Sequence, residues 1–136
     1  MLGEKIGELT GRTTGMRVLP GDDYRYVKME VTVQQTGQLA GAPVMDIGTY
    51  TIFERVPGQI YAEGQGISQG ADGGAIWNGH GVGKATGSGM AMAMRFSIAY
   101  QAGESGAFSR LKGVLVIGEH EVDAEGNTVT TLWEWK

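Results

Sequence analysis

The sequence contains no cysteine, only three prolines and no long run of either apolar or basic residues. The absence of cysteine excludes disulfides and thiolate metal sites, and it fits a reducing compartment. With a net charge of −4 and no clustered lysine or arginine, the chain lacks the surface with which proteins bind nucleic acids. Its most apolar stretch, residues 113–118, is far too short to span a bilayer.

The first eight residues also lack the apolar segment of a signal peptide. We therefore expect a soluble, cytoplasmic protein that binds neither nucleic acid nor membrane. A length of 136 residues fits one domain spanning residues 1–136, and that length allows a substantial core to be buried.

Glycine, in contrast, is abundant, with 24 residues against a typical usage of about 7%. In one predicted hairpin it occupies every second position on both sides of the turn: Gly64 and Gly66, then Gly79, Gly81 and Gly83. Alternate residues of a strand share a face, so these glycines form a stripe. Such a stripe lets a sheet bend to close a barrel, lets a ring such as Trp77 or Tyr61 lie over it, or lets a subunit or ligand approach closely.

The opposite face of this hairpin carries four polar residues, which we name the hairpin polar cluster: Glu63, Gln65, Asn78 and His80. Glu63 and His80 can form an acid–base pair, because an imidazole exchanges protons near neutral pH. Gln65 and Asn78 can donate hydrogen bonds to a developing oxyanion. The sequence leaves two alternatives, a ligand-binding site in a cavity or a solvated outer face.

Alternation of apolar and polar residues predicts further strands outside this hairpin: residues 4–18, 24–35, 44–55, 90–101, 108–121 and 128–136. Turns are predicted at residues 20–23, 57–58 and 123–127, with a short connection or an edge segment at 37–43. No segment has convincing helical periodicity. About eight short strands predict an all-β barrel or sandwich. Because closure removes exposed edges, we expect an antiparallel eight-stranded barrel of lipocalin-like shape, whose interior is filled or holds one small ligand.

Two residues outside the hairpin complete the candidate ligand-binding set. Tyr50 can offer its hydroxyl in a pocket. Arg95 is the one charge in a strand whose even positions, from Met90 to Tyr100, are all large. If Arg95 faces the interior it needs a carboxylate or an anionic ligand, and if it faces outward it is solvated.

A metal site is not expected. Of the two histidines, His120 stands between Glu119 and Glu121, but adjacent strand residues point to opposite faces. No segment has a phosphate-binding or dinucleotide-binding pattern followed by a helix. We therefore expect no metal and no cofactor.

Several motifs together resemble a group of small uncharacterised bacterial proteins classed with the allene oxide cyclase-like barrels. They are Lys5–Glu8, Thr14–Pro20, Gly48–Tyr50, Glu63–Gly66, Trp77–Gly83 and Leu132–Lys136. The resemblance spans nearly the whole chain and implies an eight-stranded, often oligomeric barrel. The plant cyclases of this superfamily are cofactor-free isomerases that bind an unsaturated fatty epoxide inside the barrel. Their catalytic residues have no counterpart that can be placed here.

Three functions are compatible with these observations. The first is a barrel that binds a small, mostly apolar molecule. The second is a cofactor-free isomerase or cyclase that uses the same cavity, with Glu63 and His80 handling protons. The third is a structural oligomer with a filled barrel. The amount of apolar surface favours a homo-oligomer, a dimer or trimer.

Overall fold

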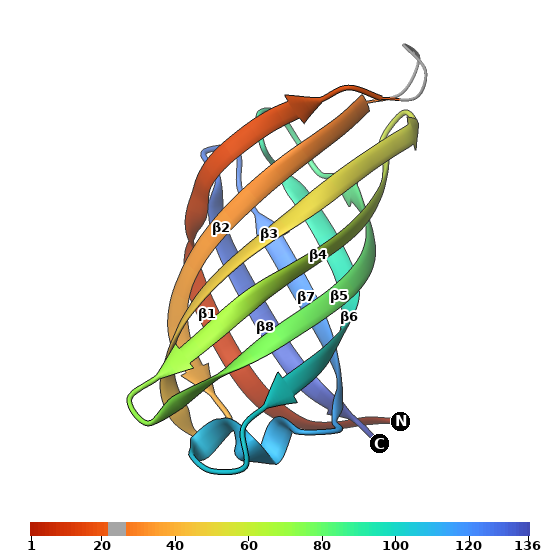
Figure 1. The fold of residues 1–136 in the computed structure, drawn as a ribbon. Helices are drawn as coiled ribbons and strands as arrows, with labels where there is room; N and C mark the ends of the chain where they lie inside the picture. Colours follow the sequence, from red (N-terminus) through yellow and green to blue (C-terminus); the bar gives the residue numbers. More distant parts are fainter. Residues whose placement is uncertain (22–26) are drawn as a thin grey trace.

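The computed structural model describes residues 1–21 and 27–136, which form a closed barrel of eight antiparallel strands (Figure 1). The strands follow one another around the barrel in chain order, and β1 pairs with β8 to close it. Their bounds are β1 (Leu2–Leu19), β2 (Val27–Leu39), β3 (Ala42–Val56), β4 (Gln59–Gly70), β5 (Gly73–Ala85), β6 (Met92–Ala102), β7 (Leu115–Val122) and β8 (Asn127–Trp135). The prediction of an all-β, eight-stranded antiparallel barrel is confirmed.

The connection expected at residues 37–43 is wrong, because β2 and β3 continue through it as a paired hairpin. Only Ala40 and Gly41 form the turn, with φ of 52° and 81°. Positive φ at both central residues is typical of the tight turns whose twist matches that of the flanking strands. The turn predicted at residues 20–23 and the start of the strand predicted at 24–35 fall partly outside the described residues.

The strand expected at residues 108–121 is also wrong in its first part. Residues Ala107–Leu111 form the short 3-10 helix η1, and β7 begins only at Leu115. Phe108 and Leu111 are buried and pack into the core near the end of the barrel that also holds both termini (Figure 1). The segment therefore consists of a short helix packed on the core followed by a strand. Across the two described ranges, no helix is long and apolar enough to cross a membrane.

Inside the barrel, large side chains of β6 stand opposite glycines of β5. The register pairs Met94 with Gly83, Phe96 with Gly81 and Ile98 with Gly79. The predicted alternation in β6 is confirmed, since its even residues point inward. Missing side chains on one strand thus make room for large ones on the next, as close packing of an interior requires.

The tightest example of this packing involves Trp77, whose ring lies against two paired glycines, Gly48 and Gly66. A Cβ atom at Gly48 would lie 2.3 Å from Trp77 Cζ2, and one at Gly66 would lie 2.4 Å from the same atom. Of the alternatives for the glycine stripe, a ring lying over it is therefore observed for Trp77. Tyr61 instead points outward and is 46% exposed.

The core consists of two apolar clusters. One includes Leu9, Leu39 and Leu132 together with Phe108 and Leu111. The other is built from residues of β2, β3, β4, β6 and β7: Val31, Val33, Ile52, Ala62, Met92, Met94 and Val122. The polar inward side chains described below lie in the interior that both clusters border.

We expect Gly66→Ala to lower the free energy of unfolding by about 1–3 kcal/mol, because the new methyl group would overlap the Trp77 ring. Chemical denaturation measures this change. Gly15→Ala is the matched control, since nothing lies within 4 Å of a Cβ built there. It should change stability by less than about 0.5 kcal/mol. Equal effects of the two substitutions would contradict the proposed role of the Trp77 contact.

Self-association into a dimer or trimer stays a prediction. On the outer face, Ile47, Ile67 and Ile76 are neighbours in the register of β3, β4 and β5, and they are 40–50% exposed. Exposed apolar groups of this kind often mark contact surfaces. Light scattering at micromolar concentration should give at least twice the monomer mass, and a monomeric mass would contradict the prediction.

Candidate functional site

The hairpin polar cluster lies on the outside of the barrel. Its four residues share one face of the hairpin, as expected, since Glu63 pairs with His80 and Gln65 with Asn78. All four residues are exposed, with His80 and Glu63 side chains 63% and 50% accessible and 3.6 Å apart. The expectation that this cluster faces the cavity is therefore wrong, because the glycine stripe faces inward to accommodate the rings. Ligand binding by the outer cluster stays a prediction.

The other two candidate residues, Arg95 and Tyr50, lie on opposite faces of the barrel wall. Arg95 points outward from β6 and lies 3.4 Å from Glu119, with its side chain 73% exposed. It is solvated, the second of the two alternatives. Tyr50 points inward from β3, and its hydroxyl oxygen is buried.

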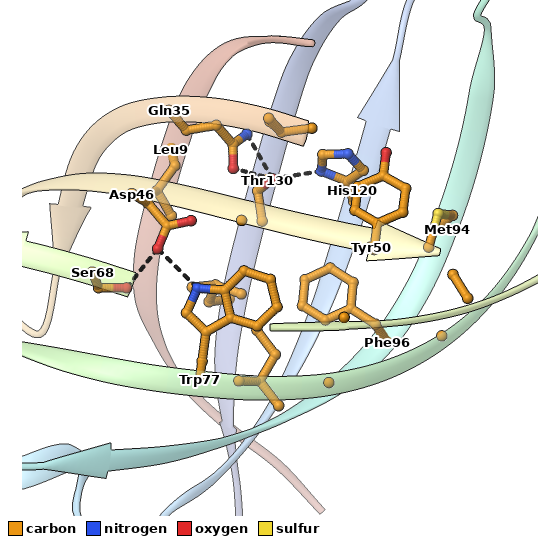
Figure 2. A pocket seen from close by; sticks show the side chains of 18 of the residues that line it. Leu9, Gln35, Asp46, Tyr50, Ser68, Trp77, Met94, Phe96, His120 and Thr130 are labelled. Atoms are coloured by element: carbon orange, nitrogen blue, oxygen red, sulfur yellow. Dashed lines mark hydrogen bonds between the residues drawn. The ribbon is translucent and has the colours of Figure 1, made fainter. Parts of the chain in front are cut away.

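The barrel interior contains a cavity that borders both apolar clusters (Figure 2). The space open to the centre of a water molecule is about 90 Å³. One water needs only about 10–15 Å³ on this measure, so the cavity is large enough for several waters or one small organic molecule. The barrel is therefore not completely filled by its own side chains.

Asp46 occupies one side of this cavity. Its Oδ1 accepts a hydrogen bond from Ser68 Oγ at 2.6 Å and another from Trp77 Nε1 at 3.0 Å. Oδ2 receives no hydrogen bond from a described residue. Burial raises the pKa of the Asp46 carboxyl above its usual value, and the two donors partly offset this effect.

A second polar group is a network of four side chains from β2, β7 and β8. Gln35 Nε2 donates to Thr128 Oγ1 at 2.9 Å and to Thr130 Oγ1 at 2.8 Å. Thr130 Oγ1 also lies 2.8 Å from His120 Nδ1. The network joins β2 to β8 across the interior and fixes the plane of the His120 ring.

Two buried side-chain atoms in the described ranges have no hydrogen-bond partner, Tyr50 Oη and His120 Nε2. Both residues line the cavity, and their rings meet edge to face with centroids 5.9 Å apart. Burial lowers the pKa of His120 to about 4, so its ring is neutral at pH 7. Burial likewise raises the pKa of Tyr50, which keeps its hydroxyl protonated.

Sequence reasoning missed Asp46, Gln35, His120 and Thr130 as members of a common site. A signal existed, because each is a polar residue at an inward position of an otherwise alternating strand. Gln35 continues the buried series of Val31 and Val33. What alternation alone does not give is which of the two faces of each strand points inward.

Within residues 1–21 and 27–136, no group of three His, Cys, Asp or Glu side chains is arranged to hold a metal ion. His120 faces inward, whereas its neighbours Glu119 and Glu121 are exposed. The expected separation of these three side chains by strand alternation is confirmed.

These features define a small closed β-barrel with a partly polar cavity, and comparison with solved structures finds the same fold. A protein of unknown function from Clostridium acetobutylicum superposes with a TM-score of 0.79 at 10% identity, covering 98% of each chain. A conserved protein of unknown function from Rhodopseudomonas palustris gives a TM-score of 0.77 at 12% identity, covering 98% of this chain and 97% of that chain. No protein-family model and no curated protein matches the sequence. Similarity at this identity shows a shared fold alone.

We expect the free energy of unfolding to fall as the pH is lowered from about 6.5 to about 4, because the unfolded chain takes up a proton that buried His120 resists. The folded-state pKa lies below the unfolded one, so this stabilisation is complete above the unfolded pKa and is lost as the pH falls through the folded pKa. A shift of this size corresponds to at most about 3 kcal/mol.

Urea denaturation near pH 7 and near pH 4.5 measures the loss. His120→Asn should reduce it, since asparagine keeps a hydrogen-bonding atom near Thr130 but takes up no proton. His80→Asn, on the outer face, should retain the full loss. If His120→Asn loses as much stability in acid as the parent, the buried imidazole is not the source of the acid-induced loss of stability.

Proposed function

We propose that the chain is a binding barrel that holds one small, mostly apolar molecule in its cavity. The observation that carries this proposal is the pair of unpartnered buried atoms, Tyr50 Oη and His120 Nε2, on the wall of one cavity. A buried polar group without a partner costs about 1–3 kcal/mol, which a suitably placed ligand group recovers. Apolar neighbours such as Leu9, Met94 and Ile98 supply the remaining contact surface.

The hydrogen-bonding capacity of this pair limits the polar part of the ligand. A neutral imidazole has one donor and one acceptor, and Thr130 already engages Nδ1. Nε2 therefore offers a single hydrogen-bonding position, while the Tyr50 hydroxyl both donates and accepts. One small polar group, such as a hydroxyl, carbonyl or amine, matches this pair.

A second candidate, a cofactor-free isomerase, is favoured by Asp46. Its free Oδ2 and raised pKa suit a group that accepts and returns a proton inside a cavity, and Tyr50 can donate a hydrogen bond to a ligand oxygen. In this mechanism Asp46 handles the proton in place of Glu63 and His80, because those two side chains lie outside the barrel. Deuterium uptake by cyclohexanone from heavy water, absent with Asp46→Asn, would support catalysis. Equal uptake with the variant would contradict it.

We also propose a relationship to the allene oxide cyclase-like barrels that the glycine and tryptophan motifs resemble. The closed, eight-stranded antiparallel barrel with an interior cavity supports it. Glycines of the matching segments, among them Gly48, Gly66 and Gly79, lie on the inner wall.

Binding can be tested with benzyl alcohol and toluene, which differ by one hydroxyl group. In amide NMR titrations we expect both to shift resonances of inward residues. Tyr50→Phe should weaken benzyl alcohol binding about five-fold, the equivalent of one hydrogen bond, and leave toluene binding unchanged.

The matched control is Gln34→Glu, which alters the exposed outer face of the neighbouring strand and should bind both molecules like the parent. If neither compound shifts an inward residue at millimolar concentration, recognition of a neutral ligand through Tyr50 and His120 is wrong.

A further inference from the structure

The ionisable groups around the cavity are unevenly distributed. The inward-pointing ones are Asp46, Tyr50, Tyr100 and His120. In the part of the chain that the structure describes, no lysine or arginine lines the cavity. An anionic ligand would therefore meet a carboxyl group and no compensating cation, an arrangement that disfavours carboxylates and phosphates.

The carboxyl group of Asp46 has one committed oxygen and one free oxygen. Ser68 and Trp77 both donate to Oδ1, and this fixes the orientation of the group. Oδ2, with no donor from a described residue, is left for a ligand. A carboxylate in an apolar interior is stabilised most strongly by a cationic hydrogen-bond donor.

Aromatic side chains line much of the same cavity. Four of them, Tyr50, Trp77, Phe96 and Tyr100, border it (Figure 2 labels the first three). Aromatic rings attract organic cations through the negative charge of their faces, and Trp is the strongest of the three types. A carboxylate beside several aromatic rings, with no basic side chain, is the chemistry that recognises ammonium groups.

The neutral state of His120 removes an obstacle to such a ligand. A protonated imidazole in the same cavity would repel a second cation. Burial disfavours that form, and the contact of Nδ1 with Thr130 leaves Nε2 facing the cavity without a partner. Among the inward-pointing ionisable side chains of the described residues, Asp46 carries the one carboxyl group, so any charge that it bears is negative.

From this arrangement we propose that the ligand is a small organic amine, bound in its ammonium form. The ammonium group donates to Asp46 Oδ2, and its hydrocarbon part lies among the aromatic side chains, Trp77 foremost. This inference rests on the proposed function, and it adds the chemical class of the ligand.

Three compounds of nearly equal size test the charge preference: benzylamine, benzyl alcohol and benzoate. In NMR titrations near neutral pH, benzylamine should bind the parent protein at least about ten-fold more tightly than benzyl alcohol. Benzoate should not bind measurably in the cavity.

Asp46→Asn provides the matched variant, because an asparagine oxygen can still accept the bonds from Ser68 and Trp77 while the charge is removed. We expect the preference for benzylamine over benzyl alcohol to fall to about one, with benzyl alcohol affinity changed less than about three-fold. Glu121→Gln removes a carboxylate from the outer face of β7 and should leave the preference intact.

The outcomes separate the two proposals. If benzyl alcohol or benzoate binds the parent protein as tightly as benzylamine, the amine assignment is overturned and the binding barrel stands. If none of the three compounds binds, the binding barrel itself is wrong. If Asp46→Asn does not fold, the affinity ratio in the parent protein decides alone. An unchanged preference in a folded Asp46→Asn protein would overturn the role of Asp46.

Discussion

The contact between the Trp77 ring and the paired glycines 48 and 66 is the constraint on which the interior depends. It holds the indole against the wall formed by β3 and β4, where its N–H reaches Asp46. The same principle recurs on the other side of the barrel, where a Cβ at Gly118 would lie 2.2 Å from Phe96 Cζ. Rings placed against bare backbone leave space in the middle of the barrel, and that space is the cavity.

Fixing the rings in this way also determines where polar groups can be tolerated. Asp46 is acceptable inside because Ser68 and Trp77 satisfy one of its oxygens, and Gln35 is acceptable because two threonines accept from its amide. Buried polar groups persist when they are bonded, and a ligand or water completes those that are not. The apolar clusters provide the core, whereas these few polar side chains give the interior its chemical character.

Much of the fold could be predicted from the sequence, because period-two alternation marks strands locally and short turns force neighbours to pair. The separation of glycines and polar residues onto the two faces of the glycine-rich hairpin followed from the same alternation. The orientation of the hairpin did not, since a stripe of glycine and a stripe of polar residues are equally unlike a conventional core face. The orientation is set by Trp77 and by the large side chains of β6, which can pack inside the barrel only against the glycine face. Likewise, Phe108 and Leu111 have no alternation to distinguish a strand from a short helix that packs on the core.

The closing pair of strands differs from the other seven in how it is held. Every other interface joins strands that are consecutive in the chain, so the intervening residues keep the partners together even when their hydrogen bonds open. Between β1 and β8 the backbone ladder, ending in a bond from the Lys136 N–H to the Met1 carbonyl, has no such tether. Loop closure over almost the whole chain must be overcome to form it, although this entropy grows only slowly with length. A short peptide linking Lys136 to Met1 would turn this seam into an eighth hairpin, so that new chain ends could be placed at an exposed turn while the order of strands around the barrel stays the same.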